Sequence, residues 1–159
     1  MAKRPSAKAS SEANKVKAAN NAYYKALSAR DMCAMAKVWS CAPNNILIAP
    51  PTNPITHIGW EAIRRNWEGY WSTFSRFSVS MVVTTVNVNG PVAWVHGIET
   101  SHRRAKSGDV THSRNYGTNI FVNRDGSWLL EFHQSVLIPE APEGSNRGRT
   151  IPLIGRSQH

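Results

Sequence analysis

The side chains best suited to proton transfer lie on predicted strands in the second half of the chain. Glu99 and Glu131 are the acids that the sequence places on strands, and His96 lies three residues before Glu99. An enclosed carboxylate or imidazole can remove a proton next to a carbonyl group, and a hydroxyl such as that of Tyr116 can stabilise the resulting oxyanion. We therefore take Glu99, His96 and Tyr116 as candidate catalytic residues.

The strand around Glu99 leaves two candidates for the base, because its side chains alternate between two faces. Glu99 shares a face with Val95 and Gly97. His96 shares the other face with Trp94. If the small-residue face lines a pocket, Glu99 is the base; if the Trp94 face does, His96 is. The ordinary structural alternatives are an exposed carboxylate at position 99 and a hydrogen-bonded structural histidine at position 96.

Metal and cofactor signatures are absent from the sequence. The histidines form neither an HxH nor an HExxH pattern, and Cys33 and Cys41 have no further cysteine partners. There is also no P-loop, Rossmann glycine run or G-x-S-x-G elbow. We predict no metal and no cofactor, with both cysteines as free thiols in a reducing cytosol.

The formal net charge of +9 is concentrated near the N-terminus. Residues 1–37 hold eight Lys and Arg against two acids, whereas residues 38–139 hold eight against six. The predicted sheet lacks the interleaved basic and aromatic side chains that stack on bases, so nucleic-acid binding is disfavoured. No apolar run reaches the roughly 18 residues of a membrane span, and the N-terminus lacks the apolar segment of a signal peptide. We predict a cytoplasmic protein.

Hydrophobic periodicity places the candidate residues in one α+β domain over 12–139, between a basic tail over 1–11 and an irregular tail over 140–159. Helices are predicted over 12–29, over 32–39 with Asp31 as the N-cap, and over 60–74. Strands are predicted over 46–49, 55–58, 77–88, 92–101, 110–122 and in a last run beginning near Trp128. Helices grouped on one face of a curved antiparallel sheet predict a cone-shaped domain of about six strands and three helices that closes a pocket.

The third predicted helix carries aromatic side chains that would wall this pocket. Trp60, Trp67 and Trp71 lie along one stripe of it. Core packing is the default role of such a stripe, and its rings also offer a stacking surface for a flat, apolar organic ligand. Together with Trp94 and Gln134, these tryptophans are our candidate ligand-pocket residues.

Several segments resemble a known family. They read VWSCAPNNILIAPP and IGWEAIRRNW within 38–67, AWVHG over 93–97, and GTNIFVNRDGSWLLEFHQS over 117–135. They are similar to the SnoaL-like branch of the nuclear transport factor 2-like superfamily, over about residues 20–140. The resemblance implies a cone-shaped α+β fold with a cavity and a homodimer packed through the convex sheet face. It also implies an isomerase, cyclase or dehydratase acting on a small organic compound, or a non-catalytic binding or dimerisation module.

The last strand departs from the pattern of many relatives, which carry alternating histidines there. The resemblance places Phe132 and Gln134 at those positions. Simple alternation puts these two residues with Trp128 on the face expected to meet the core, and puts His133 with Glu131 on the opposite face. A histidine-based mechanism at the usual cavity position is therefore not expected.

Overall fold

Three helices and six strands make up the described residues, 7–48 and 55–139, of this computed structural model. The helices are α1 (Ala7–Ala29), α2 (Met32–Val38) and α3 (Trp60–Ser72). The strands are β1 (Ile46–Ile48), β2 (Thr56–Ile58), β3 (Phe74–Asn89), β4 (Val92–Ala105), β5 (Val110–Arg124) and β6 (Ser127–Leu137). The predicted C-terminal tail and residues 1–6 of the predicted N-terminal tail lie outside the described residues.

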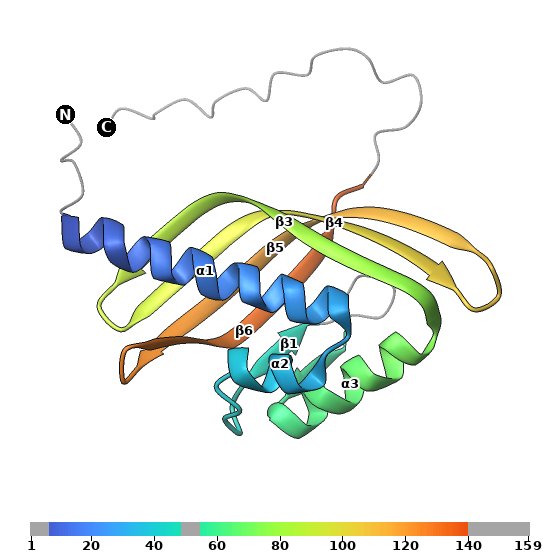
Figure 1. Ribbon diagram of the computed structural model, residues 1–159, viewed down its shortest axis with the longest axis horizontal. Coiled ribbons are helices and arrows are strands. Elements are labelled where there is room, and N and C mark those ends of the chain that lie inside the picture. The colour runs from blue at the N-terminus through green and yellow to red at the C-terminus, as the bar shows by residue number, and fades with distance from the viewer. Residues whose placement is uncertain (1–6, 49–54, 140–159) are drawn as a thin grey trace, which may run out of the picture.

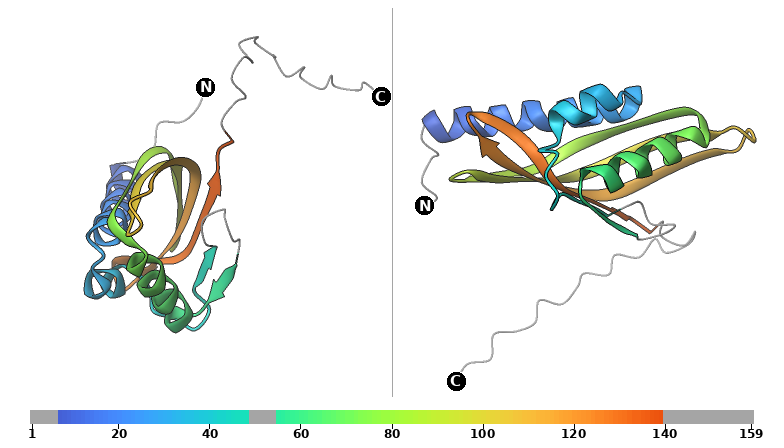
Figure 2. Two further views of the ribbon diagram at one scale, coloured as in Figure 1. Left: turned by 90° about the vertical axis from the view of Figure 1, so that its right-hand side faces the viewer. Right: turned by 90° about the horizontal axis from the view of Figure 1, so that it is seen from below.

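The six strands form one curved sheet in the order β2-β1-β6-β5-β4-β3. Neighbouring strands are antiparallel except β1 and β6, which run parallel. The sheet does not close on itself, and β2 and β3 form its edges. Helix α1 crosses the concave side, and α3 packs near the end of that same side (Figures 1 and 2). The predicted α+β class, with helices on one face of a bent sheet, is confirmed.

Local sequence signals account for several boundaries of these elements. Helix α1 begins at Ala7 rather than at the predicted Glu12, because the intervening Ala and Lys residues favour helix. Helix α2 is capped as predicted, since Asp31 accepts a hydrogen bond from the Ala34 backbone N–H at 2.9 Å. The β5–β6 turn places Asp125 and the following glycine at positive φ, as a tight hairpin requires.

The core lies between the helices and the concave face of the sheet. Its largest fully buried apolar side chains come from helices and strands alike: Tyr23, Met35, Trp39, Leu47, Ile63, Val95, Phe121 and Leu130. Burial of each such side chain contributes roughly 1.5–3 kcal/mol relative to leaving it exposed. This packing fixes α1 against the strands that carry the candidate site.

A β-bulge interrupts the pairing of β5 with β6. Ile120 of β5 pairs with Phe132 of β6. The next residue of β5, Phe121, pairs with Leu130, so Glu131 has no partner of its own across the ladder. One extra residue in a strand shifts the side-chain alternation by one from that point onward.

The bulge corrects the prediction of which face of β6 meets the core. His133 and Ser135 are buried and share the inner face with Trp128. Phe132 and Gln134 instead point to the outer face. Simple alternation failed because it assumes an unbroken ladder, and the expectation that no histidine of β6 reaches the cavity was wrong.

Two glycines keep space open on the inner face of the sheet. Gly97 of β4 is paired directly with Gly117 of β5. A Cβ at position 97 would lie 2.3 Å from the backbone oxygen of Val82, on the neighbouring strand. A Cβ at position 117 would lie 2.5 Å from Cε of Met81 and 2.8 Å from Cδ of Glu99. Because position 97 has no side chain, the backbone of β3 can lie close to β4. Because position 117 has none, the side chains of Met81 and Glu99 can lie against β5.

We expect Gly97→Ala to lower the free energy of unfolding by roughly 1–3 kcal/mol, because backbone must shift to admit the methyl group. Gly69→Ala is the matched control. Gly69 lies in α3, and among the described residues no atom outside its own helix backbone and chain neighbours lies within 4 Å of the position that an added methyl group would take. Alanine there should therefore raise the free energy of unfolding by roughly 0.5–1 kcal/mol. Urea denaturation of the two variants measures both effects. A Gly97→Ala protein as stable as wild type would refute this account of β4.

Candidate active site

A small cavity lies between the concave face of the sheet and helices α1 and α3. Its volume is about 30 Å³, which is space for about one water molecule. Leu27, Trp67 and Phe77 contribute to its apolar wall. The strands β4, β5 and β6 contribute its polar wall, which contains Glu99, Ser101, Arg103, Asn115, His133 and Ser135.

Glu99 is the buried acid of this cavity, with 4% of its surface exposed. The alternation of β4 places it on the same face as Val95 and Gly97. Its Oε1 accepts a hydrogen bond from the Tyr24 hydroxyl at 2.6 Å, and its Oε2 accepts one from Oγ of Ser135 at 2.5 Å. The small-residue face of β4 therefore lines the cavity, and the alternative of an exposed carboxylate is wrong.

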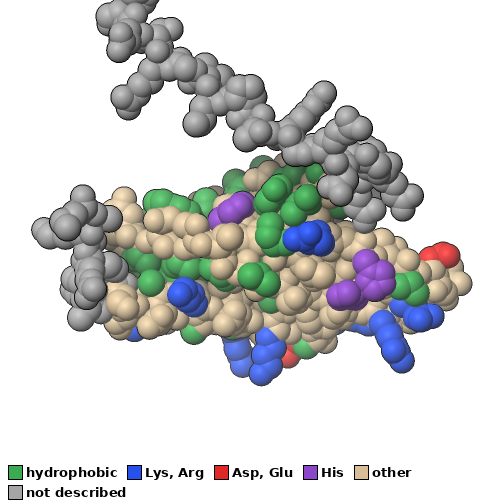
Figure 3. Space-filling view, turned by 90° about the horizontal axis from the view of Figure 1, so that it is seen from above, with side chains coloured by type: hydrophobic (Ala, Val, Ile, Leu, Met, Phe, Trp, Pro, Cys, Tyr) green, Lys and Arg blue, Asp and Glu red, His purple; other side chains and the backbone are tan. Residues whose placement is uncertain are grey.

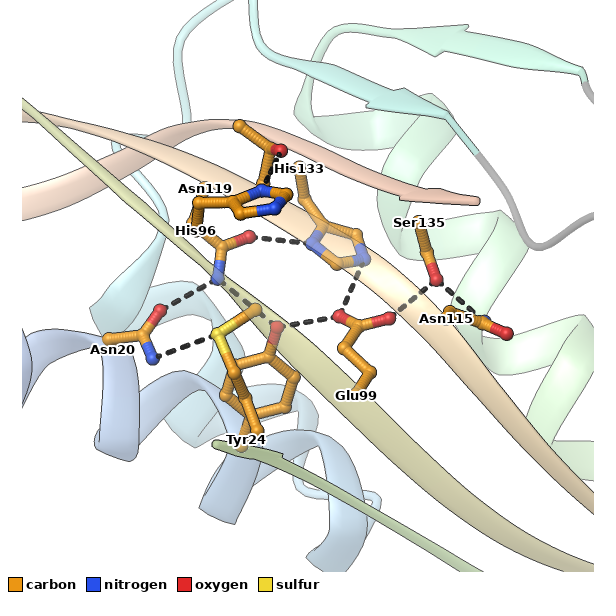
Figure 4. A network of polar contacts seen from close by, with 10 residues as sticks. Asn20, Tyr24, His96, Glu99, Asn115, Asn119, His133 and Ser135 are labelled. Carbon is orange, nitrogen blue, oxygen red and sulfur yellow. Dashed lines mark hydrogen bonds and ion pairs between the residues drawn. The ribbon is translucent and has the colours of Figure 1, made fainter. Parts of the chain in front are cut away.

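Two asparagines orient the hydroxyl groups that contact Glu99 (Figure 4). Nδ2 of Asn119 donates to the Tyr24 hydroxyl oxygen at 3.2 Å, and Nδ2 of Asn115 donates to Oγ of Ser135 at 2.7 Å. Each hydroxyl thus accepts from an amide and has its single proton free for the carboxylate. Hydrogen bonds to an ionised acceptor are stronger than neutral ones and offset the cost of burying the charge.

The same network selects one tautomer of His133. Its Nδ1 lies 2.6 Å from Oδ1 of Asn119, while Nδ2 of Asn119 donates to Oδ1 of Asn20 at 2.7 Å. Because Oδ1 of Asn119 only accepts, Nδ1 of the imidazole carries the proton. The other ring nitrogen, Nε2, is left with a lone pair and lies 3.8 Å from Oε1 of Glu99.

Burial governs the protonation of the groups around Glu99. It lowers the pKa of His133, and the opposing attraction of the Glu99 charge is the smaller effect. Burial also raises the pKa of Tyr23 and of Tyr24 well above the usual value, and the Glu99 charge raises both further. At neutral pH the site therefore holds a neutral imidazole beside hydroxyl groups that remain donors.

Three buried polar atoms on the cavity-lining residues have no hydrogen-bond partner within the described part of the chain. They are Nε1 of Trp67, Nε of Arg103 and Oδ1 of Asn115. The other nitrogens of Arg103 are engaged, since Nη1 donates to the Tyr70 hydroxyl at 2.7 Å and Nη2 donates to Oγ of Ser113 at 3.1 Å. Unpaired buried polar groups are costly, so these atoms are positions where a bound molecule would gain hydrogen bonds.

Four of the predicted site residues lie on the outer face of the sheet, away from the cavity. His96 contacts Oγ1 of Thr118 at 3.1 Å through Nδ1, and its ring stacks on Tyr116 at 5.9 Å between centroids. Trp94 is 39% exposed. The bulge in β6 turns Gln134 to this same side. The assignment of Trp94 and Gln134 to the pocket is corrected accordingly, and the geometry gives His96 and Tyr116 no access to Glu99.

The three tryptophans of α3 have different surroundings. Trp67 lines the cavity. Trp71 is buried and stacks on Trp67, with 6.1 Å between ring centroids. Trp60 packs on Trp39 at 6.5 Å and lines a separate surface hollow that also involves Cys41. Of the three tryptophans, one therefore lines the cavity, and Tyr70 is a second ring of the same helix in its wall.

Sequence reasoning missed the residues of α1 that complete the site. Asn20 and Tyr24 are buried on the helix face that also buries Val16 and Leu27. A polar residue on the apolar stripe of a helix is a signal for a buried hydrogen-bond network, because such a group requires partners. Asn119 is the corresponding signal in β5, where it is fully buried.

Within 7–48 and 55–139, no three His, Cys, Asp or Glu side chains come together as metal ligands. Across the same residues, no helix is long and apolar enough to cross a membrane.

The fold is similar to those of several solved structures. One is a nuclear transport factor 2-like superfamily protein from Salmonella enterica serovar Typhimurium, with a TM-score of 0.74 and 15% identity over 87% of this chain and 99% of that one. A second is a ketosteroid isomerase-like protein from Erwinia carotovora atroseptica, with a TM-score of 0.71 and 19% identity over 81% of this chain and 98% of that one. A third is a candidate dehydratase of the nuclear transport factor 2-like family from Streptomyces avermitilis, with a TM-score of 0.70 and 18% identity over 82% of this chain and 99% of that one. No curated protein matches the chain.

A family assignment follows from the sequence itself. The family model of the SnoaL-like domain matches residues 16–139, which include every element from the middle of α1 to the end of β6. The solved structures share the fold at low identity and agree with this match. The chain therefore belongs to the SnoaL-like domain family.

Proposed function

We propose that the protein is an acid–base catalyst that moves a proton next to a carbonyl group of a small organic substrate. The observation that carries this proposal is the buried pair of Glu99 and His133 at the cavity, with Nε2 3.8 Å from Oε1. Both carboxylate oxygens already accept hydrogen bonds. Because Nδ1 of His133 carries the proton, Nε2 has a free lone pair, and we assign His133 as the base and Glu99 as the charge that stabilises its protonated form.

The proposed step is enolisation. Nε2 of His133 takes the proton from a carbon next to the carbonyl, and the electrons of the broken C–H bond move onto the carbonyl oxygen as an enolate. The unpaired N–H groups of Trp67 and Arg103 are the donors available to that oxygen. Return of the proton to another carbon gives an isomerisation, and its transfer to a departing hydroxyl group gives a dehydration with loss of water.

We expect His133→Gln to slow proton exchange by about 10²- to 10⁴-fold, the usual contribution of a general base. The measurement is the exchange of α-C–H for deuterium in small 2-oxo acids and ketones dissolved in D₂O, followed by proton NMR. His96→Gln is the matched control, because His96 lies on the outer face, and it should exchange at the wild-type rate. Equal rates in the two variants, or no exchange above buffer by the wild type, would refute the assignment.

Stability should fall as the pH drops below about 6.5, the ordinary pKa of histidine. Because the folded protein lowers the pKa of His133, the unfolded chain binds this proton at higher pH than the folded chain does. The stabilisation is complete above the unfolded pKa and is lost as the pH falls from there through the folded pKa. Urea titrations at several pH values should therefore show that the free energy of unfolding falls more steeply with decreasing pH in the wild type than in His133→Gln. Parallel pH dependences would contradict a buried neutral imidazole.

The outer face of the sheet supports a second candidate function, a dimerisation module without catalysis. Val82, Trp94, Tyr116 and Val136 are exposed large apolar residues from four neighbouring strands. Figure 3 shows apolar side chains gathered on this convex surface. Exposed apolar patches of this kind mark protein contacts. We propose a homodimer packed through this face, which is compatible with either function.

We expect the wild-type protein to sediment as a dimer and Tyr116→Lys/Val136→Lys to sediment as a monomer, because two buried charges would oppose the interface. Ile58→Lys is the control, since Ile58 is an exposed apolar residue of the edge strand β2, and it should remain dimeric. Sedimentation velocity measures all three proteins. A monomeric wild type, or a dimer that survives the double substitution, would exclude this interface.

A further inference from the structure

A second and larger hollow lies beside the end of α1, over the paired ends of β3 and β4. Its volume is about 460 Å³, a size suited to a small molecule. Four arginines line it: Arg30, Arg76, Arg103 and Arg104. No acidic side chain is among the described residues that line it. We call this hollow the arginine groove.

The two outermost arginines of the groove are placed against each other. Arg76 of β3 and Arg104 of β4 are direct cross-strand partners, and both are exposed. Like charges directly opposite each other weaken a strand pair. Among the described residues, neither guanidinium group has a hydrogen bond or an ion pair. An anion bound between the two guanidinium groups would offset their repulsion, which would explain why the two arginines are paired.

The other two arginines are held in place by the fold. Arg30 at the end of α1 donates to the backbone oxygens of Phe74 and Ser75, each at 2.9 Å. Arg103 donates to the Tyr70 hydroxyl and to Ser113. The groove therefore contains two guanidinium groups that are already anchored, and this preorganisation lowers the entropic cost of binding an anion.

The groove and the inner cavity share a wall. Phe77 and Arg103 line both spaces. Arg76 and Arg104 alternate with these two residues and lie on the outer face, so an anion between them would be separated from the cavity of His133 by the β3–β4 ladder. Nε of Arg103 is buried and has no hydrogen-bond partner among the described residues.

We propose that the arginine groove is a binding site for a small oxyanion, a molecule with a carboxylate or phosphate group. The planar fork of a guanidinium group matches both kinds of oxyanion in a bidentate way. This inference goes beyond the proposed function, since the two free arginines of the groove lie outside the cavity of His133.

The test is isothermal titration of the full chain with inorganic phosphate and, separately, with succinate, in chloride-free buffer of low ionic strength. We expect saturable binding of at least one anion, weakened at least ten-fold in Arg76→Gln/Arg104→Gln. The matched control is Arg65→Gln/Arg114→Gln, which removes two exposed arginines outside the groove and should change the affinity less than two-fold. Preference for phosphate or for succinate tells which oxyanion the groove recognises.

Absence of saturable binding to either anion would overturn the inference, and so would equal weakening in the two double variants. The outcome is separable from that of the proposed function. His133→Gln should keep the wild-type affinity for the anion while losing proton exchange. Anion binding that depends on Arg76 and Arg104 in a protein without exchange would leave the groove intact and refute the catalysis alone.

Discussion

The burial of Glu99 is the constraint on which most of this architecture depends. An ionised carboxylate removed from water must find hydrogen-bond donors inside the protein, since an unpaired buried charge is strongly destabilising. Here the donors come from distant parts of the chain, with Tyr24 on α1 and Ser135 on β6. Asparagines of β5 orient both hydroxyl groups. The position of α1 across the concave face and the register of three strands are thus coupled to one side chain.

The bulge at Glu131 connects this constraint to the proposed chemistry. Without the extra residue, the β6 side chains beyond Leu130 would alternate the other way, and neither His133 nor Ser135 would face the cavity. Gly117 has a complementary role, because a methyl group there would occupy the space of the Glu99 side chain. The catalytic proposal therefore depends on two backbone features of the sheet as much as on the reactive side chains.

Much of the fold is predictable from the sequence because its signals are local. The Asp31 cap, the turn at Asp125 and the helical stripe of α3 each depend on a few neighbouring residues. The candidate site is less predictable. Both faces of β4 carry apolar residues, so periodicity could not decide which one is concave. The hydrogen bond between Asn20 and Asn119 joins residues 99 positions apart, and no local pattern reports such a contact.

The network around Glu99 holds His133 as a neutral imidazole with its proton on Nδ1 and a free lone pair on Nε2. Nitrogen-15 NMR of the histidine rings tests this directly, because protonated and unprotonated ring nitrogens have distinct chemical shifts. We expect His133 at neutral pH to show a protonated Nδ1 and an unprotonated Nε2, and we expect Asn119→Ala to disturb this pattern. A proton on Nε2, or on both nitrogens, in the wild-type protein would contradict it.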